Sequence, residues 1–372
     1  MNRGTFQITQ WTATFLAKRA GNERGAVVVI VAIMLVAFMG IGALALDVSN
    51  ALVARNELQN VADGAALAGA RQIGVIYQGL PQGTPYTTYV LSDTTAVVGA
   101  VTGVAINNTA RQVSVGINNS DIVFGVWDST TRTLTPGNVG VTAVRVTARR
   151  DASANGPVAT WLAGVLGVSS MSVVTTATAA LTGTGVLLPG EANAPFGLDE
   201  MIFTNPAYCG TPIQFYPTNN PPTGCAGWHT FVSSPPNANT NRQQINGLIP
   251  NPPTYQSPGI TAGQTGLEYI GGNLATNLPD LQNLYEAKKV PDASSPSGFC
   301  WNVTIPVYPN QGCSNPNSLM MTIGFASACV WEVQAPPVGQ VINARVTCGE
   351  VTNGQGGGGN FGTLGSIPGL VE

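Results

Sequence analysis

Charged side chains are scarce in this chain, and their scarcity excludes several functions. Only 9% of the 372 residues are Asp, Glu, Lys or Arg, against about 25% in an average soluble domain. Lysine occurs only at Lys18, Lys288 and Lys289, and the formal net charge is −3. Without a basic patch, binding of nucleic acid has no electrostatic basis. Asn, Thr, Ser and Gln supply the polarity instead, a composition typical of proteins outside the cytoplasm.

Histidine is rarer still, and this limits catalysis. A Ser-His-Asp or Cys-His arrangement would have to use His229, the one histidine, and no G-x-S-x-G motif supplies a nucleophile. Asp199 and Glu200 form an acidic pair, but neighbouring carboxylates in one loop lack the separation that glycoside hydrolysis needs. We therefore predict that the protein is not an enzyme and that His229 lies in a loop with a structural role. No cofactor or metal is predicted.

Cysteine is absent from the first 208 residues, and six cysteines follow: Cys209, Cys225, Cys300, Cys313, Cys329 and Cys348. Their spacing lacks the close pairs of a zinc site, whereas an even number in an oxidising compartment indicates disulfides. We predict three disulfides. Residues 328–333 and 341–348 have the pattern of a hairpin that places Cys329 opposite Cys348. Cys209–Cys225 and Cys300–Cys313 would then close local loops.

One long uncharged stretch stands out against this polar background. Residues 26–46, AVVVIVAIMLVAFMGIGALAL, contain 21 uncharged positions. As a helix they would be about 31 Å long, close to the hydrocarbon thickness of a bilayer. Four basic residues and one acidic residue precede the stretch, and mainly acidic residues follow it. The positive-inside rule therefore places residues 1–25 in the cytoplasm and the chain after Asp47 outside. A cleaved signal peptide with an A-x-A site at Ala43 and Ala45 is the alternative, but its apolar core would be shorter.

The helix is predicted to continue beyond the membrane. From Ser49 to Ile73 there is no proline, and apolar residues recur at helical spacing. Four of them define an interaction stripe: Leu58, Val61, Ala65 and Ala68. The small alanines would let another surface approach closely. That surface is either the protein's own next domain or a neighbouring subunit, and the sequence leaves both readings open.

Residues 47–185 are predicted to form an α+β domain built on this helix. A linker rich in Gly and Pro is expected at 74–84. The pattern then predicts, in chain order, a helix at 86–104, strands at 111–117, 122–127 and 141–148, a short helix at 157–166 and a strand at 171–181.

Residues 186–355 are predicted to form a β-rich domain held by the disulfides. Proline runs such as 217–222 exclude regular helix or central strand. The expected elements are strands at 302–308, 319–325, 328–333 and 341–348 and a helix at 278–287. Residues 356–372, which begin with four glycines, are predicted to be a flexible tail. Trp228, Trp301 and Trp331 either fill a small core or form a surface for glycans.

The segment around the apolar stretch resembles a known family. RGAVV at 24–28 opens the stretch, LDV at 46–48 closes it, and LQNVADGAALAGA comes next at 58–70. This pattern resembles the N-terminal domain of the TadG-like (TadE/G-like) proteins of bacterial Flp pili and tight-adherence secretion systems. The strand–helix–strand pattern at 141–183 also resembles the region after the N-terminal domain of such proteins, which implies a pilin-like domain. Pilin-like members carry a Glu shortly after the cleaved glycine, where this chain has Ile30.

We therefore interpret the chain as a bitopic protein of the bacterial inner (cytoplasmic) membrane, with its N-terminus in the cytoplasm and its bulk in the periplasm or outside the cell. The resemblance implies a function in Flp pilus assembly or surface adherence, by packing and not by catalysis. The expected partners are the lipid bilayer, other pilus-assembly or pilin-like envelope proteins, and further copies of the chain through the N-terminal helix.

Two alternatives stay open. An anchored carbohydrate-binding or carbohydrate-active protein would be indicated by a cleft with two separated carboxylates. A minor pilin-like filament subunit would be indicated by a mature chain that begins near residue 26.

Overall fold

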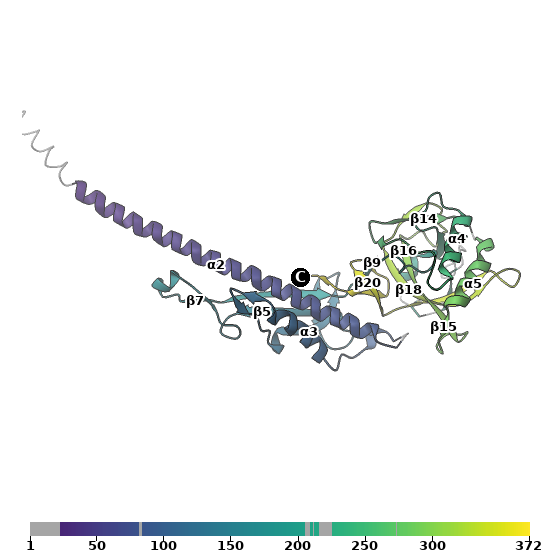
Figure 1. Ribbon diagram of the computed structural model, residues 1–372, viewed down its shortest axis with the longest axis horizontal. Helices are drawn as coiled ribbons and strands as arrows, with labels where there is room; N and C mark the ends of the chain where they lie inside the picture. The colour runs from purple at the N-terminus through teal and green to yellow at the C-terminus, as the bar shows by residue number, and fades with distance from the viewer. Residues whose placement is uncertain (1–22, 82–83, 205–208, 211, 216–224, 273) are drawn as a thin grey trace, which may run out of the picture.

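The computed structural model describes residues 23–372, except 82–83, 205–208, 211, 216–224 and 273. Nearly all of the predicted cytoplasmic segment, and the proline run at 217–222, therefore lie outside the described residues. Figure 1 shows one long helix, a first domain along the C-terminal half of this helix, and a second domain beyond its C-terminal end. The chain mixes helix and sheet, as the sequence predicts.

Helix α2 (Glu23–Gln78) is continuous over 56 residues, which corresponds to a length of about 84 Å. It ends one turn beyond its predicted end at Ile73, because this last turn still faces the core. Ile73 and Tyr77 are buried, and the Tyr77 hydroxyl donates a hydrogen bond to the Val141 carbonyl (2.7 Å). The linker expected from residue 74 therefore starts only after Gln78.

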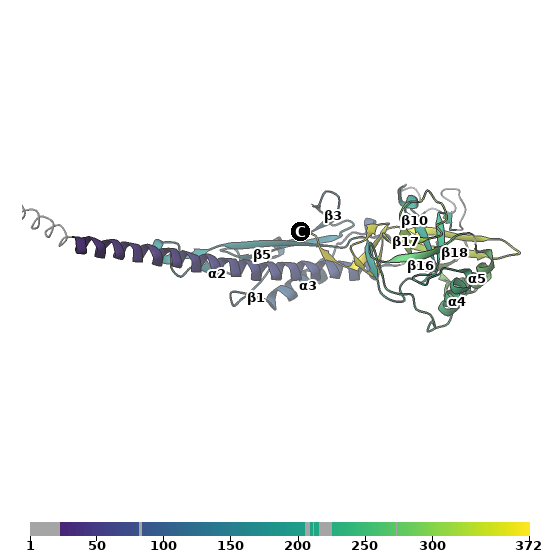
Figure 2. The ribbon, with the colours of Figure 1, turned by 90° about the horizontal axis from the view of Figure 1, so that it is seen from above.

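The first domain is a five-stranded antiparallel sheet with two helices on one face. In spatial order its strands are β23 (Gly369–Leu370), β8 (Val173–Ala180), β5 (Ala143–Arg150), β3 (Ile122–Asp128) and β4 (Thr133–Pro136). Helices α2 and α3 (Thr95–Ile106) pack together on this sheet, as Figure 2 shows. Val144, Val146 and Ala148 alternate along β5 with half-buried polar residues and point into the core beneath the helices.

Strands β3, β5 and β8 lie where the sequence predicts strands, but the helix expected at 86–104 is shorter. Residues 86–88 form the 3-10 turn η1 (Tyr86–Thr88), where the Tyr86 N–H donates to the Gly349 carbonyl of the second domain (2.7 Å). Helix α3 starts only at Thr95, whose N–H donates to the Asp93 carboxylate (2.9 Å). A contact far along the chain therefore overrides the local helical pattern.

Two further predictions in this domain are wrong in part. The strand expected at 111–117 is reduced to β2 (Val113–Ser114), which pairs with β1 (Thr109–Ala110). The helix expected at 157–166 is replaced by two short elements, β6 (Val158–Ala159) and the 3-10 turn η3 (Ala163–Leu166). Strand β6 pairs with β7 (Ser170–Met171), which follows the turn. Backbone N–H groups of this segment bind a carboxylate of α2, described below, instead of forming an α-helix.

The second domain contains a ten-stranded mixed sheet. Its main path is β11 (Pro212–Gln214), β19 (Val341–Thr347), β18 (Gly324–Gln334), β16 (Phe299–Tyr308), β10 (Phe196–Asp199), β12 (Ala226–His229), β14 (Gly266–Ile270) and β17 (Leu319–Met321). Beside this path, β15 (Val290–Pro291) pairs with β16 and β21 (Gly359–Asn360) pairs with β18. The strand expected at 319–325 is thus divided between β17 and β18, whereas the other three expected strands are present.

Two helices pack on each other beside this sheet, α4 (Ala238–Leu248) and α5 (Leu278–Lys288). The sequence predicts α5 but not α4, because α4 is mostly polar and buries only Ile245 and Leu248 as large apolar residues. Further 3-10 turns in the described part of the chain are η2 (Asn119–Asp121), η4 (Glu200–Thr204) and η6 (Ala275–Asn277).

A four-stranded sheet lies between the two domains, in the order β13 (Ile260–Thr261), β9 (Thr184–Leu187), β20 (Glu350–Gly356) and β22 (Thr363–Ile367). The flexible tail predicted at 356–372 is wrong, because β21, β22 and β23 all lie within it. Its glycines allow close backbone contact, since a Cβ at Gly358 would collide with the Thr184 carbonyl. The chain then returns to the first domain, where Leu370 pairs with Ala179. The first domain thus includes residues from both ends of the chain.

The six cysteines form three disulfides, but the predicted pairing is wrong. The bonds join Cys209 to Cys348, Cys225 to Cys313 and Cys300 to Cys329. The predicted hairpin exists as β18 and β19, yet its register places Cys329 opposite Arg345 and leaves Cys348 beyond the last strand pair. Cys329 lies opposite Asn302 on the other neighbouring strand, β16, and therefore diagonal to Cys300.

Candidate functional site

The apolar stretch of α2, residues 26–46, is an open hydrophobic surface. Its large side chains are exposed, among them Phe38 at 71% and Val28 at 68%. Within the described residues, α2 is the one helix long and apolar enough to cross a membrane. A contiguous apolar surface of this size marks contact with a membrane or with another protein.

Asp47, the first residue after this stretch, is buried although it carries a carboxylate. It accepts hydrogen bonds from three successive backbone N–H groups, those of Trp161 (2.7 Å), Leu162 (3.0 Å) and Ala163 (2.6 Å). The pKa of Asp47 is lowered below its ordinary value by these bonds, and the bond from the Trp161 N–H has the largest effect. The carboxylate therefore ties the segment after β6 to α2 at the end of the apolar stretch.

The sequence indicates Asp47 only as a flanking charge and misses this structural role. The available signal is its position, since Asp47 is an isolated acidic residue between Leu46 and Val48 at the end of an uncharged run. An isolated carboxylate among apolar residues needs hydrogen-bond donors, and here the donors come from 114 to 116 residues further along the chain.

Most of the interaction stripe faces the chain's own first domain. Leu58, Val61 and Ala65 are buried in one core with residues of α3, β5 and β8, whereas Ala68 is half-buried. Small residues let the helices approach, since a Cβ at Gly69 would lie 2.7 Å from Cγ2 of Val101 in α3. The contact surface of the stripe is thus the adjoining domain, the first of the two readings that the sequence leaves open.

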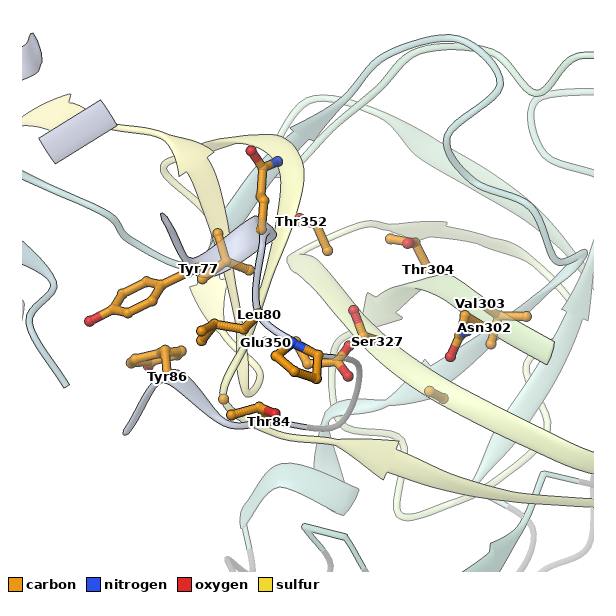
Figure 3. A pocket seen from close by; sticks show the side chains of 15 residues that line it. Tyr77, Leu80, Thr84, Tyr86, Asn302, Val303, Thr304, Ser327, Glu350 and Thr352 are labelled. Atoms are coloured by element: carbon orange, nitrogen blue, oxygen red, sulfur yellow. The ribbon is translucent and has the colours of Figure 1, made fainter. Parts of the chain in front are cut away.

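A cleft of about 310 Å³ opens where α2 ends against the second domain. Figure 3 shows its lining side chains: Tyr77 and Leu80 near the end of α2, Thr304 on β16, and Glu350 and Thr352 on β20. Hydroxyl and amide groups dominate, and Glu350 is the single carboxylate among the described lining residues. Its described lining residues do not include the carboxylate pair that glycoside hydrolysis requires.

The two catalytic candidates lie apart and within the fold. His229 ends strand β12, not a loop as predicted, and is completely buried; its Nδ1 accepts from the Phe231 N–H (3.2 Å). Burial lowers the pKa of His229 to about 3. Asp199, also buried, accepts from the N–H groups of Gln311 (2.9 Å) and Cys313 (3.0 Å). The register of β10 and β12 places the two side chains at opposite ends of the strand pair.

The tryptophans of the second domain are core residues. Trp228, Trp301 and Trp331 are all buried, and the rings of Trp228 and Trp301 both meet Phe196 edge-on, with centroids 6.2 and 6.5 Å away. They therefore fill the core and do not form an aromatic surface for glycans.

One group of potential metal ligands occurs among the described residues, Asp292 with Cys300 and Cys329, whose ligand atoms lie within 4.8 Å of one another. The two sulfurs are joined in a disulfide, so this group supplies no thiolate to a metal.

Comparison with known proteins gives two matches, both before the second domain. Residues 25–72 match the family described as putative Flp pilus-assembly TadE/G-like, and residues 80–179 match the family described as putative Tad-like Flp pilus-assembly. No curated protein and no solved structure matches the chain. The first match confirms the resemblance seen in the sequence, and the second extends it through the first domain to β8. Both matches end before the second domain begins.

Proposed function

We propose that this chain is a membrane-anchored envelope protein of Flp pilus assembly, on the premise that residues 25–179 match two families of putative Flp pilus-assembly proteins. The observation that carries the proposal is the continuity of α2. One helix exposes the apolar stretch at 26–46 and then buries residues from Ala54 to Tyr77 in the core of the matched domain. An anchor and a folded domain that share a helix move as one body.

The charge pattern and the disulfides support an orientation. The flank before the apolar stretch is basic, so the proposal places residues 1–25 in the cytoplasm and both domains beyond the inner membrane. All six cysteines lie in disulfides of the second domain, which suits an oxidising compartment. The chain would act through protein contacts and not through catalysis. Its anchored first domain would hold the second domain in a fixed position, where other pilus-assembly proteins can bind it.

The test is complementation of a deletion in the bacterium that encodes the chain, with surface pili counted by electron microscopy. The wild-type chain should restore pili, and so should a matched control in which residues 27–46 are replaced by a Leu/Ala run of equal length. An exported soluble form that begins at Asp47 behind a cleavable signal should not restore them. Non-reducing immunoblots would check that each form accumulates with its disulfides intact.

Two outcomes would contradict the proposal. Normal pili in the deletion strain would show that pili assemble without this chain, which would contradict a role in assembly. Full restoration by the soluble form would keep the assembly role and remove the anchor.

A further inference from the structure

The segment that joins β5 to β8 contains an unexplained exposed tryptophan. Residues 157–171, PVATWLAGVLGVSSM and hereafter the β5–β8 loop, contain no charged residue. Three of its large apolar side chains are exposed, Trp161 at 77%, Val168 at 49% and Leu162 at 40%. The core of the first domain does not use these side chains, so another surface is needed to account for them.

The β5–β8 loop is fixed at one level along α2. Asp47 holds its backbone by the three hydrogen bonds described above, and the Asn50 amide donates to the Ala159 carbonyl (3.2 Å). At the start of the loop, the Arg150 guanidinium donates to the Gly156 and Pro157 carbonyls (2.8 and 3.4 Å). Figure 1 shows β7, at the end of this loop, on the side of the first domain nearest the N-terminal half of α2.

That level coincides with the edge of the apolar stretch. Residues 26–46 span about 31 Å as a helix, the thickness of the hydrocarbon core, so Asp47 would lie at its boundary. The interfacial region beyond the hydrocarbon is about 5–8 Å thick on each side.

The exposed apolar side chains of α2 follow the same boundary. Val48, Leu52 and Val53 are exposed and lie within about 9 Å of Asp47 along the helix axis. From Ala54 to Gly74, a fully described stretch, no large apolar side chain of α2 is exposed. Between Asp47 and Gly74, exposure of large apolar side chains on α2 therefore stops within a few ångströms of the outer limit of the interfacial region. The next exposed one is Val75, about 42 Å from Asp47 along the helix axis.

We infer that the β5–β8 loop is a second membrane contact, with Trp161 in the interfacial region of the outer leaflet and Leu162 and Val168 beside it. The inference rests on the membrane anchoring proposed above. The amphipathic ring of tryptophan favours this depth. Because the loop carries no charge, the contact requires no anionic lipid and is insensitive to salt. If α2 were the only membrane contact, the first domain could rotate about the helix axis. A second contact through the loop would fix which face of the first domain is turned towards the bilayer.

The test uses the full chain reconstituted in phosphatidylcholine vesicles and measures quenching of tryptophan emission. The lipids carry bromine either near the headgroup or near the end of the acyl chains, and iodide serves as a quencher in water. The Trp161 signal is the difference between wild type and Trp161→Phe, a change at an exposed site that leaves the fold intact. The matched control is Trp127→Phe, on β3 at the end of the sheet where β5 begins, whereas the β5–β8 loop follows the opposite end of β5.

We expect the Trp161 difference signal to lose most of its intensity with lipids brominated near the headgroup, to lose less with deep bromines, and to resist iodide. The Trp127 difference signal should show the reverse, with no lipid quenching. Trp161 emission quenched by iodide and untouched by either lipid would overturn the inference. Flotation after carbonate extraction separates this failure from failure of the proposed function, because a chain that leaves the vesicles under carbonate has no membrane anchor.

Discussion

Acid should destabilise the second domain through a single side chain, His229. Its imidazole is completely buried and neutral, and burial lowers its pKa to about 3. In the unfolded chain its pKa returns to about 6.5. Between these two values the unfolded state binds one proton that the folded state refuses, so the free energy of unfolding falls as pH falls.

The slope is about 1.36 kcal/mol per pH unit in this window. From pH 7 to pH 4.5 the second domain should therefore lose about 2.7 kcal/mol through His229, because the loss starts only below the unfolded pKa near 6.5. No other histidine contributes, since His229 is the only one in the chain. Carboxylates titrate at lower pH and leave most of this window to His229.

The assay is urea unfolding of the oxidised full chain in detergent at several pH values, followed by tryptophan fluorescence. Trp228 and Trp301 lie in the second-domain core, and Trp331 is buried on β18, so all three report the unfolding of this domain. His229→Gln is the matched variant, because its amide does not titrate. It should be less stable than wild type at pH 7 and should lose the slope between pH 6.5 and 4.5.

Two results would refute this reasoning. A wild-type stability that stays flat from pH 7 to pH 4.5 would mean that the folded state accommodates the charged imidazole. Equal slopes in wild type and His229→Gln would assign the pH dependence to other groups.

The remaining predictions concern packing and cross-links. Gly74→Ala should lower the free energy of unfolding of the first domain by about 1–3 kcal/mol, because the new Cβ would lie 2.6 Å from a backbone oxygen of β22. At Gly64 in the same helix, a new Cβ would make only an ordinary van der Waals contact with Val104, at 3.4 Å. Gly64→Ala should therefore raise the free energy of unfolding by up to about 1 kcal/mol. Thermal unfolding monitored by circular dichroism compares the stabilities of the two variants. Ala65→Leu should cost about 1–3 kcal/mol and Arg55→Ala less than about 0.5 kcal/mol, and equal denaturation midpoints would contradict the burial of Ala65. Peptide mapping without reductant should recover the three disulfides given above, and any other pairing would show the strand register to be wrong.

Local periodicity in the sequence predicts much of this fold. The uncharged run and the stripe after it predict α2, because both depend only on residues within a few turns. The alternation of Val144 and Val146 with polar neighbours predicts β5, and the β-branched run before Leu181 predicts β8. These elements belong to the part of the chain whose family the sequence also indicates.

Distant contacts decide the elements that the sequence misses. The segment after Pro157 has the residues of a short helix, yet its N–H groups donate to Asp47, more than 100 residues earlier. The start of α3 is delayed because Tyr86 binds Gly349 in the other domain. The disulfide pairing depends on the register of β16, β18 and β19, and no local pattern around a cysteine carries that register.

The flexible tail predicted at 356–372 is the error of sequence reasoning with the largest consequence. The chain instead returns to the first domain after four glycines, and this return changes how the second domain is attached. The second domain leaves the first after β8 and comes back as β23, so two chain connections join the domains instead of one. Arg71 and Gln78 of α2 add hydrogen bonds to Ser366 (both 3.0 Å). The second domain is attached through two chain connections and through contacts at the end of α2. Its rotation relative to the first domain is therefore more restricted than that of a domain attached by a single linker. From Asp47 to Gln78 the helix measures about 47 Å. If Asp47 lies at the membrane boundary, as proposed above, the end of the helix that contacts the second domain lies at most about that far from the bilayer, and nearer where the helix is tilted.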